Sequence, residues 1–185
     1  MMRKTLAAAA MVLFSSGCDA EQAPAPSPAP FTVTPIAALS EPWAMAFLPD
    51  GRLLVTQKAG TLVIVTQDGQ VSAPLAGVPA VDYGGQGGLG DIALHPDFAD
   101  NGMIYLSYAE AGADDTRGAA VARGQLVLDG DGGRLDHMQV IWRQQPKVTG
   151  RGHYGHRLLF APDGHLFISS GERQHFDPAQ DMAQN

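Results

Sequence analysis

Cysteine and basic side chains are both scarce in this sequence. Its 185 residues include one cysteine, and 19 acidic residues outnumber 12 basic ones. A single cysteine excludes a disulfide within the chain and a zinc site with several thiolate ligands. The acidic balance excludes a broad basic surface, so neither nucleic acid nor an anionic lipid surface is an expected partner.

Several common sequence motifs are also missing. There is no P-loop, no glycine pattern of a dinucleotide-binding βαβ unit, no Cys/His zinc spacing and no Gly-x-Ser-x-Gly nucleophile elbow. The sequence therefore gives no sign of nucleotide-dependent chemistry or of a serine hydrolase. It has instead 22 glycines and 13 prolines, a composition that indicates many turns between short strands.

The N-terminus has the pattern of an export signal. Two basic residues precede an apolar stretch, Thr5–Phe14, that is too short to span a bilayer, and small residues follow it. We predict a signal peptide over residues 1–17, of the lipoprotein type because the small residues end at Cys18. The stretch resembles a bacterial lipobox, although Ser15 stands where Leu is most usual. The alternative is a cysteine that happens to lie in an ordinary signal peptide.

These features predict where the protein resides. We expect it to be exported, periplasmic and held at the cell envelope by a lipid on Cys18, which would be its only contact with the membrane. Residues 18–32 are expected to form a Pro/Ala-rich tether, because they cannot bury enough apolar surface to fold. Removal of the signal peptide takes away two basic residues and changes the formal net charge from −7 to −9.

Residues 33–185 are expected to form one domain of short β-strands. The first apolar runs, residues 43–48, 52–56 and 61–66, are separated by Pro-Asp-Gly and Lys-Ala-Gly turns. Proline fixes φ for the second position of a turn, and glycine accepts the positive φ that can follow. This is the pattern of an antiparallel meander.

The first hairpin recurs twice along the chain. Each copy has an apolar strand, a Pro-Asp turn and a second apolar strand, as expected when one structural unit repeats. The Pro-Asp pairs lie at 49/50, 96/97 and 162/163. Their spacing is about that of a four-stranded blade, with an insertion in the second interval. It predicts an all-β chain of the β-propeller type.

About three blades can be counted in the sequence. The expected strands of the later blades cover residues 92–98, 103–108, 119–128, 139–143, 157–160 and 165–169, with loops over 109–118 and 130–133. Three blades leave open sheet edges and no closed ring. We therefore expect a truncated chain that is the N-terminal part of a larger propeller. The alternative is a short protein that completes its ring by oligomerising.

Two polar stretches could carry chemistry. Gly84–Asp91 is dense in glycine and leads into a strand, and Gln86 is its only long polar side chain. Such glycines let the backbone approach a ligand closely, or simply give a flexible entry loop. His153 and His156 lie in the loop before the last hairpin, where an imidazole can accept a proton from a substrate hydroxyl or can merely be solvated. Two histidines without a third ligand are a weak metal site.

The remaining titratable residues divide into two groups. Glu172 and Arg173 follow the last hairpin, so titratable residues lie in both loops that flank it, where an all-β scaffold commonly carries function. The other histidines are expected to be structural or surface residues: His95, His137, His165 and His175.

The order of these motifs resembles one known family. Residues 42–183 are similar to the quinoprotein glucose/sorbosone dehydrogenases, the soluble aldose sugar dehydrogenases that use pyrroloquinoline quinone (PQQ), and especially to their bacterial periplasmic branch. The matching stretches are Pro42–Phe47 with Pro49–Gly51, Gly85–Leu89 through His95–Phe98, Ile104–Tyr108, Gly152–Gly155 through Arg157–Leu158, Gly171–Glu172 and Ala179–Asp181.

The resemblance implies a six-bladed β-propeller that oxidises an aldose at C1 to the lactone, with hydride passing to the quinone. It implies that His153 is the general base for the C1 hydroxyl proton, and that Gln86 lies on the substrate side near the quinone. Removing this proton as hydride leaves avoids a full positive charge on the sugar carbon. In the glucose dehydrogenase branch an Asp precedes the catalytic His, whereas this chain has Gly152, so the acidic partner of His153 is not identified. His156 stands where a small residue is usual and is expected to narrow the site.

The resemblance also implies a calcium ion on the quinone oxygens and an external electron acceptor. The basic residues for the quinone carboxylates and the calcium ligands are expected beyond Asn185, so no cofactor or metal ligand is assigned in this sequence. The chain by itself is therefore expected to bind PQQ weakly or not at all, and to be inactive. The alternative is a non-catalytic β-propeller binding module of the cell envelope, either of the same ancestry or of the NHL or WD kind.

Overall fold

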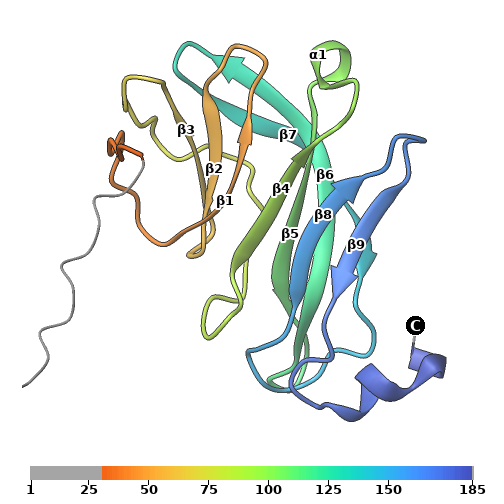
Figure 1. Ribbon diagram of the computed structural model, residues 1–185. Coiled ribbons are helices and arrows are strands. Elements are labelled where there is room, and N and C mark those ends of the chain that lie inside the picture. Colours follow the sequence, from red (N-terminus) through yellow and green to blue (C-terminus); the bar gives the residue numbers. More distant parts are fainter. Residues whose placement is uncertain (1–30, 185) are drawn as a thin grey trace, which may run out of the picture. The chain divides into compact units, whose positions relative to one another are not determined.

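The structure, a computed structural model, describes residues 31–184, and these contain nine β-strands (Figure 1). The predicted signal peptide, the lipidation site Cys18 and the tether up to residue 30 lie outside this range. Helix in the described range is limited to α1 (Phe98–Asn101), η1 (Asp177–Gln180) and η2 (Met182–Gln184). Among the described residues, no helix has the length and apolar character needed to cross a membrane.

The first sheet is the predicted meander. It contains β1 (Pro42–Phe47), β2 (Leu53–Gln57) and β3 (Thr61–Val65), paired antiparallel in that order. The turn between β1 and β2 is closed by two backbone hydrogen bonds, from Leu48 N to Arg52 O (2.8 Å) and from Gly51 N to Leu48 O (2.9 Å). Gly51 adopts φ +88° there, which side-chain-bearing residues rarely adopt.

The second sheet is the largest. It contains β4 (Leu89–Leu94), β5 (Met103–Ala111), β6 (Arg117–Asp129) and β7 (Gly132–Arg143), in antiparallel order β4-β5-β6-β7. The long connection after β4 holds α1, which ends where Gly102 adopts the left-handed conformation. This helix was not predicted, because four residues are too few to show a helical period.

The loops predicted over residues 109–118 and 130–133 are wrong in extent. β5 and β6 pair as far as Ala111 with Arg117, and β6 and β7 pair from Asp129 with Gly132. The strand expected over 139–143 therefore starts seven residues earlier, at Gly132. Glycine and charged residues favour loops in isolation, but a neighbouring strand supplies backbone hydrogen-bond partners and overrides that preference.

The third sheet is the hairpin of β8 (Gly155–Phe160) and β9 (Leu166–Ser170). Its turn has the same two hydrogen bonds as the first hairpin, from Ala161 N to His165 O (2.8 Å) and from Gly164 N to Ala161 O (3.0 Å). Gly164 adopts φ +87°, as Gly51 does in the first copy. The repeat predicted from the Pro-Asp turns is therefore confirmed at the level of single hydrogen bonds.

The first strands of the three sheets lie next to one another. β4 contacts both β1 and β8, and in Figure 1 the three sheets spread outward from these strands. This is the arrangement of consecutive β-propeller blades, so the predicted fold class is confirmed. Apolar clusters fill the spaces between the sheets. One between the first and second sheets includes Leu54, Leu62, Ile64, Leu89, Ile104 and Leu106, and one between the second and third includes Tyr105, Val121 and Leu158.

A buried carboxylate also ties the second and third sheets together. Asp91 on β4 is only 4% exposed and accepts hydrogen bonds from Leu158 N on β8 (2.8 Å) and from the Arg157 guanidinium (3.2 Å). A buried carboxylate is stable only when its oxygens are bonded in this way. The link fixes the start of β8, and hence the loop that precedes it, relative to β4.

Candidate functional site

The predicted site residues lie on loops at one end of the sheets. Residues 82–88 lead into β4, residues 144–154 lead into β8, and residues 171–176 follow β9. In Figure 1 these loops lie at the lower end of the drawing, and the Pro-Asp turns lie at the upper end. One end of the scaffold thus carries the repeated turns, and the other carries the candidate chemistry.

Gln86 and His153 are brought together although 67 residues separate them. The Gln86 side-chain carbonyl accepts a hydrogen bond from the backbone N–H of His153 (2.8 Å), and the Gln86 backbone N–H donates to the Arg151 carbonyl (2.7 Å). A Cβ on Gly85 would lie 2.4 Å from that carbonyl oxygen, so this close approach requires glycine. The glycine-dense stretch therefore serves to bring two loops into contact.

The acidic partner of His153 is Glu172. Nδ1 of His153 contacts Oε1 of Glu172, and this hydrogen bond, opposed by burial, holds the pKa of Glu172 below its ordinary value. An ionised carboxylate can only accept, so in the neutral imidazole Nδ1 carries the hydrogen and Nε2 keeps its lone pair. Nε2 has no hydrogen-bond partner among residues 31–184, and the His153 side chain is 40% exposed. Glu172 therefore engages one nitrogen of the ring, and the other nitrogen is not engaged by these residues.

Glu172 was noted in the sequence as a titratable residue after the last hairpin, but not as the partner of His153. The available signal was indirect: Gly152 offers no carboxylate, and Glu172 is the acidic residue that follows the last strand of the same antiparallel hairpin. The space beside Gly152 is occupied, because a Cβ there would lie 2.4 Å from the Gln174 side chain. The ring of Phe176 lies edge-on to His153, with the ring centres 6.4 Å apart.

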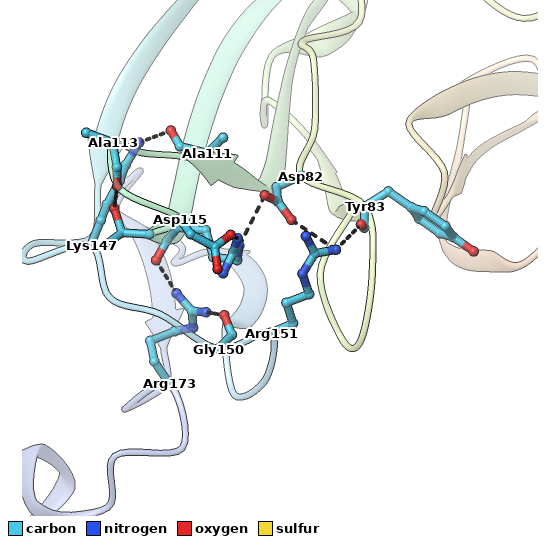
Figure 2. A network of polar contacts seen from close by, with 11 residues as sticks. Asp82, Tyr83, Ala111, Ala113, Asp115, Lys147, Gly150, Arg151 and Arg173 are labelled. Carbon is cyan, nitrogen blue, oxygen red and sulfur yellow. Dashed lines mark hydrogen bonds and ion pairs between the residues drawn. The ribbon is translucent and has the colours of Figure 1, made fainter.

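A polar network supports these loops (Figure 2). The guanidinium of Arg117 bonds Asp82 (3.1 Å) and also contacts Asp115. Arg151 donates to the Tyr83 carbonyl (2.7 Å) and lies 3.6 Å from Asp82. Both cations are therefore engaged within the protein, Arg151 on the loop that carries His153 and Arg117 at the start of β6.

His156 does not narrow the site, contrary to expectation. Its side chain is buried, stacks on Tyr154 at a ring separation of 5.2 Å and meets the edge of Trp43 at 6.1 Å. A Cβ on Gly90 would lie 2.7 Å from the imidazole, so the glycine in β4 makes room for the ring. Burial, helped by the positive charge of Arg173, lowers the pKa of His156 to about 4. The residue belongs to the packing between strands.

Two of the other histidines lie at the ends of strands. Nδ1 of His95 accepts a hydrogen bond from Asp97 N (3.0 Å) in the turn after β4. His165 is a surface residue with a side chain that is 77% exposed. Both positions agree with the structural or surface roles that we expected for them.

The described residues contain no group of three or more His, Cys, Asp or Glu side chains placed to hold a metal ion. An open cavity of about 740 Å³ borders Glu172 and is lined in part by Trp142, Arg143 and His175, but not by His153 or Gln86. We therefore do not assign the substrate to this cavity. The exposed face of His153 is the better candidate.

Comparisons with known proteins identify the family of this chain. The family model described as Glucose / Sorbosone dehydrogenase matches residues 39–185. The chain is similar to the aldose sugar dehydrogenase YliI of Escherichia coli, with 43% identity over 145 residues, which cover 78% of this chain and 38% of the relative.

Two solved structures extend the comparison. The soluble aldose sugar dehydrogenase of Escherichia coli in the apo-form is 43% identical, with a TM-score of 0.72, over 79% of this chain and 42% of that one. The PQQ-bound form of the aldose sugar dehydrogenase of Streptomyces coelicolor is 32% identical, with a TM-score of 0.67, over the same shares of the two chains, 79% and 42%. The chain thus spans about two fifths of the length of these relatives.

Proposed function

Because the chain belongs to the glucose/sorbosone dehydrogenase family, we propose that it carries the catalytic-base side of a PQQ-dependent aldose sugar dehydrogenase. The reaction is oxidation of an aldose at C1 to the lactone. The observation that carries the proposal is the setting of His153, whose Nδ1 contacts Glu172 and whose backbone N–H is bound by Gln86. Its second ring nitrogen has no hydrogen-bond partner among residues 31–184 and keeps a lone pair.

In this proposal the C1 hydroxyl of the sugar donates its proton to Nε2 of His153. The ring then becomes an imidazolium, and the adjacent Glu172 carboxylate stabilises that charge through Nδ1–H. Gln86 fixes the backbone of His153, so the ring does not have to be oriented in each turnover. PQQ, when bound, supplies the electrophilic carbonyl chemistry that accepts the hydride from C1.

The residues around His153 fit the substrate side of a quinone site. They do not fit the side that binds the quinone carboxylates, which needs free cations. Three arginines near these loops are engaged within the protein: Arg117 by Asp82, Arg151 by Tyr83 and Asp82, and Arg173 by backbone carbonyls. A quinone with several carboxylates needs further cations. Calcium, an external electron acceptor and these cations belong to the proposal through the family resemblance, and we derive no step through them from this chain.

The test is replacement of His153 by alanine in the protein expressed from its complete gene. We expect kcat with aldoses to fall by about 100-fold or more, the usual contribution of a general base, while the affinity for PQQ changes little. His165→Ala is the matched control, since that side chain is 77% exposed at the opposite end of the hairpin. An unchanged kcat in His153→Ala would remove His153 from the mechanism. A non-catalytic binding module would show no turnover even before substitution.

Export and a lipid anchor at Cys18 are also part of the proposal. They rest on the residues before the described range and have a separate test. Cells that express the complete gene should incorporate labelled palmitate into the protein, and Cys18→Ala should abolish the labelling. Labelling that survives the substitution would place the lipid elsewhere.

A further inference from the structure

Four consecutive carbonyl groups in the loop before β8 accept hydrogen bonds from only two residues. Arg173 donates from Nη2 to Gly150 O (2.7 Å), from Nε to Gly152 O (2.8 Å) and from its backbone N to His153 O (3.2 Å). Gln86 N donates to the remaining one, Arg151 O (2.7 Å). The segment that ends in His153 is therefore held at every residue, three times out of four by Arg173.

The guanidinium of Arg173 is unusual for a buried cation. The residue is 2% exposed, and no carboxylate among residues 31–184 lies within ion-pair distance of it. Its third nitrogen, Nη1, donates to the Arg117 carbonyl, and its flat face lies 3.7 Å from the centre of the Tyr154 ring. Figure 2 shows its contact with Gly150 at the edge of the polar network.

Burying an unpaired charge is costly, and the cost appears as a pKa of Arg173 below its ordinary value, caused mainly by burial. The guanidinium offsets this cost only through the carbonyls and the aromatic face. A smaller or apolar side chain could fill the same space without that cost. What arginine offers, and an apolar side chain does not, is a planar group with separate donors that bind several carbonyls at once.

The backbone at His153 needs such fixing. His153 adopts φ +48°, in the left-handed region that residues with a side chain rarely adopt. Such a conformation persists only where the surroundings enforce it. Glu172 holds the ring of His153, and the next residue, Arg173, holds its backbone, so two adjacent residues control both parts of the same histidine.

We propose that Arg173 is a positioning residue for His153, acting through the carbonyls of Gly150, Gly152 and His153 and not on substrate or quinone. This inference rests on the proposed function, in which His153 is the general base. It adds a role to a residue that neither the sequence motifs nor the reaction itself assigns.

The experiment uses the protein expressed from its complete gene and loaded with quinone. Arg173→Met keeps an unbranched side chain but removes the donors, and we expect kcat to fall about 100-fold while KM for the sugar stays within about threefold, because misplacement of a catalytic group by about 1 Å costs this much. Arg173→Lys, with one nitrogen in place of three, should be intermediate. Arg143→Met is the control, since that arginine is 47% exposed and bound to Glu110.

Two further measurements separate positioning from a general loss of structure. In a His153→Ala background, Arg173→Met should cause no further loss of residual turnover, because its effect passes through the missing imidazole. In apoprotein labelled with 15N-histidine, the His153 ring signals, identified by their absence in His153→Ala, should move in Arg173→Met and stay in place in Arg143→Met.

The proposal is overturned by wild-type kcat in a folded Arg173→Met or Arg173→Lys protein, by additive losses in the double variant, or by unmoved His153 signals. If Arg173→Met does not fold, the lysine variant decides. The proposed function fails separately, through normal turnover in His153→Ala alone. In that case the histidine spectra still report whether Arg173 holds the loop.

Discussion

The charge on Glu172 decides how His153 can act. The carboxylate contacts Nδ1 of the ring, and this hydrogen bond holds the pKa of Glu172 below its ordinary value. With the folded pKa lowered, Glu172 stays ionised down to a lower pH than in the unfolded chain, and the stability that the contact contributes is lost only as the pH falls through that lowered value. At neutral pH the ring therefore always has a negative neighbour.

Replacement of Glu172 by glutamine tests that neighbour. The amide has a similar size and can still bond the ring, but it cannot stabilise an imidazolium, so we expect kcat to fall about 100-fold or more. Glu172→Asp keeps the charge on a shorter arm and should lose less. Steady-state kinetics on the protein from the complete gene measures both, and equal kcat values for wild type and Glu172→Gln would contradict a charge-based role.

His156 makes the protein sensitive to acid. Its pKa is lowered by burial from 6.5 to about 4, so between these values the unfolded chain binds a proton that the folded chain does not. Stability must therefore fall as the pH decreases through this window, by about 3 kcal/mol in all. Urea unfolding of His156→Leu should show a flatter dependence of the unfolding free energy between pH 6.5 and 4, whereas the exposed control His165→Leu should match wild type.

At the residue scale, the sequence motifs pointed to Gln86 and His153, whose roles stay predictions, but not to the contacts around them. The motifs that contain these two residues are defined by the order of residues along the chain, so they can be recognised in the sequence. The contact of His153 with Glu172 and the burial of His156 depend on how β4 and β8 are placed in space. Those placements follow from packing between sheets, which no single stretch of sequence encodes.

The loop before β4 approaches the loop of His153 so closely that it requires glycine. Gly85 has φ +56°, and a Cβ there would lie 2.4 Å from the Arg151 carbonyl oxygen, which belongs to the loop that carries His153. Gly130, in the turn between β6 and β7, has nearly the same φ, +57°, but nothing within 4 Å. The two positions have the same backbone conformation and differ in their neighbours.

Alanine substitutions at these two glycines distinguish the effect of backbone strain from the effect of a steric clash. Both Gly85→Ala and Gly130→Ala should lower the free energy of unfolding by about 1 kcal/mol, because alanine is strained in the left-handed backbone conformation. Only Gly85→Ala should also push the loop of residues 150–153 away and lower kcat, by about 10-fold or more. Thermal unfolding and kinetics of the two variants give the comparison, and equal kcat in both would show that the close approach has no bearing on turnover.

At the scale of strands, the Pro-Asp turns predicted the hairpins correctly and composition misplaced the loops. Turns such as Pro49–Gly51 and Pro162–Gly164 are local, because φ is set by the residues themselves. The length of β7 is not local: Gly132 and Gly133 become strand because β6 lies alongside them. The helix α1 has only four residues, too few to leave a helical pattern in the sequence.

The first and third sheets present exposed apolar side chains. Met45 and Phe47 on β1 are about three fifths exposed, and so are Leu159 on β8 and its cross-strand partner Phe167 on β9. Apolar patches of this kind promote association when they stay uncovered. We expect the isolated polypeptide of residues 31–185 to self-associate, and Phe47→Lys with Phe167→Lys to reduce this. Light scattering across a concentration series would detect it, and a monomer at all concentrations would refute it.

The isolated polypeptide should also bind PQQ weakly. The arginines near His153 already have partners within the chain, so none is available for the carboxylates of the quinone without breaking those bonds. Equilibrium dialysis of residues 31–185 against PQQ tests this, with the protein from the complete gene as the positive control. Tight binding to the isolated polypeptide would mean that these loops alone make a quinone site.

The separation of the two ends of the β8–β9 hairpin has a practical consequence. The turn around Asp163 and Gly164 is exposed, with open space around Gly164, and β8 places it roughly 20 Å from the loop that carries His153. Cys18 is the only cysteine in the sequence, so a thiol introduced by Asp163→Cys would be unique within the described residues. A linker on that thiol would attach the protein to an electrode with the loop that carries His153 turned toward the solution.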